Sequence, residues 1–205
     1  MSNNSIPYFR FDKPLSKEQA RELPRTSIEK EWHGSLVTPP LHFSLALDPE
    51  ALWFCASRAN MPQCELSLAC GSFVEGLWEK ELAEVFLCSS EGPRYLEANL
   101  SPTGAWWSCS FHSYRKRDSS TPLEEVTAWA SPLSATSESW EAGLRIPLSS
   151  IASAIHFSPN EFPSRANVSG VVLSGKDPLY LTYGNLRAKE PDFHLADKFP
   201  TLTTR

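Results

Sequence analysis

Apolar and polar residues alternate along the middle of the chain with a period of two, which is typical of strands that bury one face. Three such stretches follow one another within residues 76–111, separated by two short polar turns. The alternation in the stretches 82–88 and 95–100 predicts one apolar face and one mixed face. The mixed face carries Leu82, Glu84, Phe86 and Cys88 from the first stretch and Tyr95, Glu97 and Asn99 from the second.

Similar alternation elsewhere predicts an all-β fold. The further strands are expected at 42–47, 52–57, 126–130, 140–146, 168–173 and 179–183. Seventeen prolines against nine glycines favour loops and edge strands over long helices. We therefore predict a single domain over residues 1–205, an antiparallel β-sandwich of the jelly-roll or immunoglobulin-like kind with little helix. Residues 1–30 are expected to be peripheral, with a short helix that Ser16 and Gln19 open as a capping box.

Three polar residues interrupt the mixed face described above. Glu84, Glu97 and Asn99 lie within apolar or aromatic strands, where a carboxylate lowers stability unless it is paired. Such a conflict between local rule and residue often marks a functional site. The alternative is a solvated sheet face, which antiparallel sheets allow.

Composition and charge exclude several classes of protein. Apolar residues make up 41% of the chain, which is enough for a packed core. The net charge of −5 argues against nucleic-acid binding, which needs a basic field. The one basic cluster, residues 115–117, is followed directly by Asp118 and is expected to be a solvated turn.

Targeting signals are not evident in this chain. The first ten residues lack the apolar segment of a secretory signal, and no stretch approaches the ~18 apolar residues of a membrane helix. We therefore expect a cytoplasmic protein that does not interact with membranes, with its five cysteines reduced.

Three short motifs resemble family 9 carbohydrate-binding modules. Trp78 precedes Glu84 by six positions in the segment Trp-Glu-Lys-Glu-Leu-Ala-Glu-Val-Phe, the segment Tyr-Leu-Glu-Ala-Asn ends at Asn99, and Asp-Phe-His precedes a Lys-Phe pair near the C-terminus. The resemblance extends over residues 41–202, and residues 101–107 resemble a subgroup of these DOMON-type proteins that is often found as free-standing domains.

The resemblance implies a non-catalytic site for a mono- or oligosaccharide. Trp78 and Phe193 would clasp the faces of a sugar ring, and Glu84 and Asn99 would contact its hydroxyls. Glu97 stands where the family has an arginine, and Phe193 replaces a tryptophan, so His194 would supply the missing donor. We expect no cofactor. Family members bind calcium structurally, but residues 89–91 lack the oxygen ligands of a tight calcium site.

Other functions remain open at this point. The chain could be a structural or protein-interaction sandwich that has lost sugar binding. Glu84 and Glu97 could form the acid and base of a glycoside hydrolase. A haem-binding DOMON domain would need axial ligands from Met61 and from His42, His112 or His156. Trp106 and Trp107 are adjacent in a strand, so their side chains must face opposite sides of the sheet. They could pack in the core with one ring partly exposed, or they could form an extended platform for a sugar.

Overall fold

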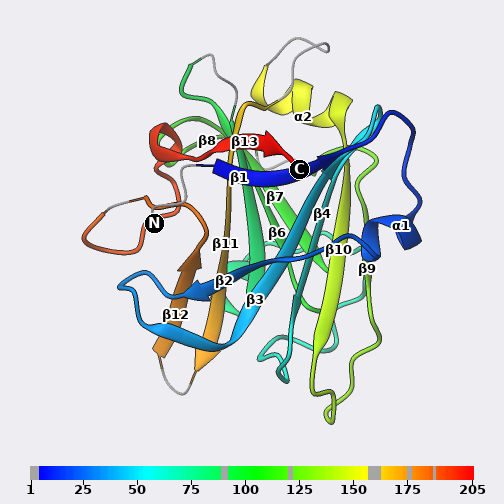
Figure 1. The fold of residues 1–205 in the computed structure, drawn as a ribbon, viewed down its shortest axis with the longest axis vertical. Helices are drawn as coiled ribbons and strands as arrows, with labels where there is room; N and C mark the ends of the chain where they lie inside the picture. Colours follow the sequence, from blue (N-terminus) through cyan, green and yellow to red (C-terminus); the bar gives the residue numbers. More distant parts are fainter. Residues whose placement is uncertain (1–4, 89–91, 120–121, 157–162, 175–176, 187) are drawn as a thin grey trace.

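The computed structural model describes residues 5–88, 92–119, 122–156, 163–174, 177–186 and 188–205. Its strands form one continuous sheet that curls into two packed layers (Figure 1). The strands of the first layer are β2 (Thr26–Lys30), β3 (Leu36–Leu47), β4 (Ala51–Arg58), β9 (Thr127–Ala130) and β10 (Trp140–Pro147). Those of the second layer are β5 (Leu82–Cys88), β6 (Tyr95–Leu100), β7 (Trp106–Ser113), β8 (Lys116–Ser119), β11 (Arg165–Ser174) and β12 (Asp177–Thr182).

Two terminal strands join the layers along one side. β1 (Ser5–Arg10) lies between β3 of the first layer and β13 (Thr201–Thr204), which continues to β11 of the second. The prediction of an all-β sandwich is confirmed, with one correction to its antiparallel character. β1 runs parallel to both β3 and β13. Residues 5–30 are less peripheral than the prediction for the N-terminal segment, because β1 completes the sheet and its Ile6 is fully buried.

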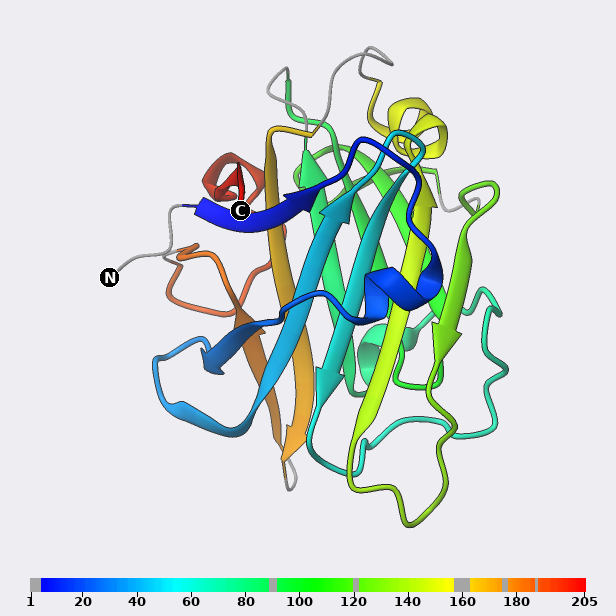
Figure 2. The same cartoon turned by 45° about the vertical axis from the view of Figure 1, so that its right-hand side comes forward.

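Helices are few and short. α1 (Lys17–Arg21) begins at Ser16 with the predicted capping box and packs against the outer face of β4 (Figure 2). α2 (Leu148–Ile155) covers one end of the sandwich, where it contacts β10 of one layer and β6 and β7 of the other. Two short 3-10 helices, η1 (Leu77–Glu79) and η2 (Ala196–Lys198), precede β5 and β13.

The main core fills the space between the layers. The apolar faces of β5 and β6, with Val85, Leu87, Leu96 and Ala98, pack against the inner faces of β3, β4 and β10. The mixed face that the sequence predicts therefore points away from this core. There it packs in a second apolar cluster under the C-terminal segment, which includes Phe199. The candidate site lies in this outer layer of packing.

Candidate functional site

A cavity of about 530 Å³ opens on the outer face of β5, β6 and β7. Its walls are largely aromatic, and its polar groups are two carboxyls, two guanidinium groups and an imidazole. The aromatic residues are Trp78, Phe86, Trp107, Phe111, Tyr180 and Phe193. The polar groups belong to Glu84, Glu97, Arg115, Arg117 and His194.

Strand register places the floor of this cavity. Glu84 on β5 lies opposite Asn99 on β6 and Ser169 on β11, so these three side chains share the outer face. Phe86 lies opposite Glu97 in the next step of the same ladder. Both carboxyls therefore follow from the alternation of the two strands.

Segments far from β5 in sequence supply the walls. Gly76 has φ +87°, a left-handed conformation that glycine adopts without strain, and it starts the turn η1 that carries Trp78. The Trp78 ring packs edge-on against Trp107, with 4.9 Å between the ring centroids. Phe193 arrives from the C-terminal segment and packs against Trp32, Phe86 and Tyr180.

The structure brings the predicted site residues together. Five of the six line the cavity: Trp78, Glu84, Glu97, Phe193 and His194. Asn99 is fully buried beside it, and its Nδ2 donates a 3.0 Å hydrogen bond to Oε1 of Glu97. Trp78 is half-buried, while Phe193 is buried, with only 9% of its surface exposed to solvent. Their role as the two walls around a sugar ring stays a prediction.

The two carboxyls are poorly solvated. Burial and the nearby Glu97 raise the pKa of Glu84 well above its usual value, and the hydroxyl of Ser169 opposes this with a 3.2 Å hydrogen bond. Burial also raises the pKa of Glu97, although Asn99, Arg117 and Arg115 favour its charged form. The pair therefore holds at least one proton near neutral pH, which lets it donate as well as accept hydrogen bonds.

The raised pKa of Glu97 makes the stability of the fold depend on pH, and the Glu97→Gln variant tests this dependence. Because the pKa of Glu97 is higher in the folded chain, its favourable contribution at low pH is lost as the pH rises through the folded pKa. We expect the variant to gain stability over wild type between about pH 5 and pH 8, on the order of 2 kcal/mol. The measurement is urea unfolding of both proteins across this range. His194 titrates in both proteins, so its opposite pH dependence cancels when their free energies of unfolding are subtracted. A difference in the free energy of unfolding that does not change with pH contradicts the account.

Two arginines at the rim of the cavity were not among the predicted site residues. The predicted solvated turn at residues 115–117 is only partly correct. Arg115 and Arg117 are exposed, but Lys116 and Arg117 begin strand β8, and both arginines line the cavity. The Arg117 guanidinium lies 5.1 Å from the centroid of the Trp107 ring and 5.5 Å from that of Trp78. The register of the β7–β8 hairpin, in which Arg117 lies opposite Phe111, is the signal that places it there.

Outer acidic groups balance both of these charges. Arg115 pairs with Asp192 at 3.0 Å, and Arg117 pairs with Glu75 at 2.9 Å. The rim is therefore close to neutral, and a ligand that reaches the floor meets Glu84 and Glu97 without a net repulsive field.

The neighbouring tryptophans divide as alternation requires. Trp106 points into the sandwich core, where it packs against Phe73, and Trp107 points to the cavity. Nε1 of Trp107 and Oδ1 of Asn99 are buried and have no hydrogen-bond partner among the residues that the structure describes. Such buried polar groups are expensive to leave unpaired.

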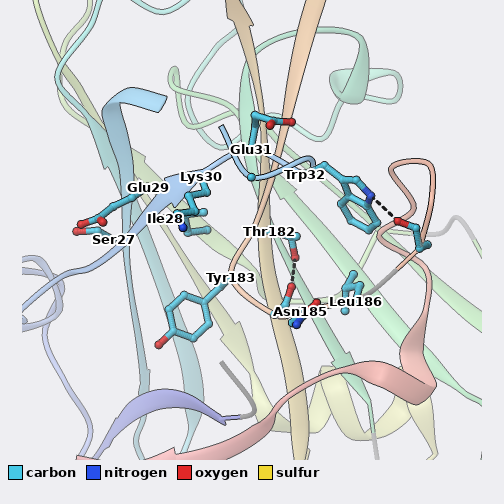
Figure 3. A pocket seen from close by; sticks show the side chains of 13 residues that line it. Ser27, Ile28, Glu29, Lys30, Glu31, Trp32, Thr182, Tyr183, Asn185 and Leu186 are labelled. Carbon is cyan, nitrogen blue, oxygen red and sulfur yellow. Dashed lines mark hydrogen bonds between the residues drawn. The ribbon is translucent and has the colours of Figure 1, made fainter. Parts of the chain in front are cut away.

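A second cavity of about 490 Å³ lies on the other side of Trp32, between the end of β2 and the segment after β12 (Figure 3). Several of its polar groups already bond within the chain. The carboxylate of Glu31 accepts from the backbone N–H groups of His33 and Ser35, and the hydroxyl of Thr182 donates to the carbonyl of Gly184. Trp32 Nε1 donates to the carbonyl of Ala188. We therefore take the first cavity as the candidate site.

Clusters of metal-ligating side chains and helices of membrane-spanning length are absent from the described part of the chain. No group of three or more His, Cys, Asp or Glu side chains within it is placed to hold a metal ion, and none of its helices is long and apolar enough to cross a membrane. The segment 89–91, on which the calcium prediction was based, lies outside the described residues. His42 contacts the Ser27 hydroxyl at 3.1 Å, and Met61 is partly exposed. The predictions on calcium and haem stay predictions.

Comparison with known proteins relates the fold to carbohydrate-binding structures. A "putative carbohydrate-binding protein" from Bacteroides uniformis superposes with a TM-score of 0.72, with 17% identity over all of both chains. A family 9 carbohydrate-binding module from Caldicellulosiruptor kristjanssonii in complex with glucose gives 0.58, with 9% identity over 98% of this chain and 95% of that one. The module from the same organism in complex with cellotriose gives 0.52, with 9% identity over 98% and 92%. No protein-family model matches the sequence, and no curated protein matches it. At these identities the likeness establishes the fold.

Proposed function

We propose that this protein binds a saccharide non-covalently in the cavity on the outer face of β5, β6 and β7. The observation that carries the proposal is the meeting of aromatic walls with two buried carboxyl groups in one cavity. A pyranose ring has two faces rich in C–H groups and a rim of hydroxyls. Trp78 and Phe193 would contact the faces, and Glu84, Glu97 and His194 would bond to hydroxyls. Asn99, buried beside the cavity, would hold the Glu97 carboxyl through its hydrogen bond.

The strength of binding follows from these contacts. Covering about 50 Å² of apolar sugar surface with each ring contributes roughly 1 kcal/mol per ring. A hydrogen bond to a charged group adds about 1.5–3 kcal/mol. After the loss of translational and rotational freedom, about 4–8 kcal/mol remains, which corresponds to a Kd in the millimolar to micromolar range.

The fold supports the proposal. The family 9 modules that share it were solved in complex with glucose and with cellotriose. Glucose and short glucans are therefore the first ligands to test. The carboxyl at position 97, where the family has an arginine, is the reason to test other sugars beside them.

Glycoside hydrolysis is a second candidate, because two carboxyls line one cavity. A hydrolase needs one protonated and one ionised carboxyl at its working pH. Here burial raises the pKa of both carboxyls, that of Glu97 to about 7, so an ionised nucleophile or base is scarce below neutral pH. We therefore propose binding without catalysis, and release of nitrophenol from aryl glycosides would contradict this part of the proposal.

Isothermal titration with a defined panel tests the proposed function. The panel is glucose, galactose, mannose, xylose, cellobiose and cellotriose, with glucosamine and glucuronate as charged probes. We expect at least one member to bind with a Kd below about 1 mM, the weak end of the range given above. An absence of heat and of tryptophan fluorescence change across the panel would favour a structural or protein-interaction domain.

A further inference from the structure

We infer that Tyr95, His194 and Glu97 form a hydrogen-bonded relay that recognises one hydroxyl of the bound sugar. The inference rests on the proposed function and assigns a positioning role to Tyr95, which does not line the cavity. Tyr95 is fully buried on β6, two residues before Glu97, and its ring stacks on Phe111 at 4.6 Å with only 4° between the planes.

The direction of the relay follows from the partners of the Tyr95 hydroxyl. Its oxygen accepts a 3.0 Å hydrogen bond from the backbone N–H of Arg115, and it lies 2.8 Å from Nδ1 of His194. Burial raises the pKa of Tyr95, so the hydroxyl keeps its proton. A buried hydroxyl proton needs an acceptor, and Nδ1 of His194 is the acceptor within reach. Tyr95 therefore donates to Nδ1, and the ring proton of a neutral His194 is on Nε2.

His194 stays neutral and well oriented. Burial and the charge of Arg115 lower its pKa to about 4, with a smaller opposing effect of Asp192 and a further lowering by Arg117. Its ring packs edge-on against Phe86, Tyr95 and Phe111 at centroid distances of 5.1–5.8 Å. Its backbone N–H donates to Oδ1 of Asp192 at 3.0 Å. The imidazole is thus held in one orientation above pH 5.

At the far end of the relay, the donor on His194 and the acceptor on Glu97 are too far apart to form a hydrogen bond with each other. Nε2 of His194 lies 3.9 Å from Oε2 of Glu97, which is longer than a hydrogen bond, and both residues line the cavity. When Glu97 is ionised, a hydroxyl oxygen placed about 2.8 Å from both atoms would accept from Nε2–H and donate to Oε2. An alkyl hydroxyl can satisfy both bonds at once, whereas an ether oxygen or a C–H group cannot. The pair therefore selects for a free hydroxyl at one position of the sugar.

Tyr95→Phe tests the relay, because it removes the hydroxyl and keeps the stacked ring. The first readout is the ¹⁵N spectrum of the imidazoles, with the His194 signals assigned from His194→Gln. We expect wild type to show the Nε2–H form of His194 between about pH 5.5 and pH 8, since its pKa lies below this range. We expect the Tyr95→Phe variant to show a mixture of both tautomers. An Nδ1–H form in wild type overturns the inference.

The second readout is affinity for the tightest-binding sugar of the panel above and for its set of monodeoxy derivatives. We expect one derivative to bind wild type about tenfold more weakly, and Tyr95→Phe to weaken binding of the parent sugar about fivefold while that derivative binds both proteins alike. Tyr183→Phe, which alters a tyrosine of the second cavity, is the matched control and should bind as wild type does. Sugar binding that Tyr95→Phe leaves unchanged overturns this inference alone. Failure of every sugar to bind overturns the proposed function, and this inference with it.

Discussion

Trp78→Ala is expected to weaken saccharide binding by about 10- to 30-fold while leaving the protein folded. The indole supplies one proposed wall of the site and is half-buried on a short turn outside the main core. Its loss removes roughly 1 kcal/mol of apolar contact with the sugar and leaves Arg117 free to move into the vacated space, and the two effects together amount to about 1.4–2 kcal/mol. Titration calorimetry with the tightest sugar of the panel measures the change.

Two variants make this result specific to the ring. Lys80→Ala changes an exposed residue in the same turn and should keep wild-type affinity. Trp78→Phe keeps a smaller aromatic surface and should lose less affinity than the alanine variant. Stability should fall by only about 1 kcal/mol in Trp78→Ala, the contribution of its edge-on contact with Trp107. Unchanged sugar binding in Trp78→Ala would remove this residue from the site.

The largest effect on stability is expected from Glu81→Ala. Glu81 lies between η1 and β5, and its carboxylate is almost completely buried. Oε1 accepts hydrogen bonds from Arg58 Nη1 at 3.3 Å and from Trp140 Nε1 at 3.2 Å, and Oε2 accepts from the backbone N–H of Gln63 at 3.3 Å. Removing the carboxylate leaves the buried guanidinium of Arg58 without its counter-ion, which destabilises a fold by about 3–5 kcal/mol.

Urea unfolding measures this effect, and Glu79→Ala is the matched control. Glu79 is exposed in the same short segment, so its replacement should change the free energy of unfolding by less than about 0.5 kcal/mol. Since Glu81 ties the turn that carries Trp78 to β4 and β10, its loss should also weaken sugar binding. A destabilisation below about 1 kcal/mol in Glu81→Ala would show that Arg58 finds other partners.

Alternation of side chains explains why much of the site could be predicted from sequence. In β5 and β6 the period of two fixes which residues share a face, and the conflict of Glu84, Glu97 and Asn99 with that face marked them as unusual. Local pattern was sufficient because adjacent strands of a hairpin place these residues side by side. The strands predicted on this basis are all present, whereas β1, β2, β8 and β13 were not predicted.

Features that depend on distant pairing were not predictable in this way. β1 is short and contains Pro7, and its place in the sheet depends on pairing with β13, which comes from the other end of the chain. The burial of Glu81 likewise depends on Arg58 and Trp140, which no local pattern connects to it. Arg117 was expected to be solvated and is exposed. Its position over the Trp107 ring follows from the register of the β7–β8 hairpin, which the sequence pattern did not reveal. The relay through Tyr95 required the position of His194, which is 99 residues away.

Intermolecular NMR contacts between the tightest-binding sugar and the aromatic side chains test the central claim most directly. The account predicts nuclear Overhauser effects from ring protons of the sugar to the Trp78 indole and to the Phe193 ring. Contacts to Tyr183 and Trp32 of the second cavity without any to Trp78, or contacts to the opposite layer at Trp53 and Trp129, would contradict it.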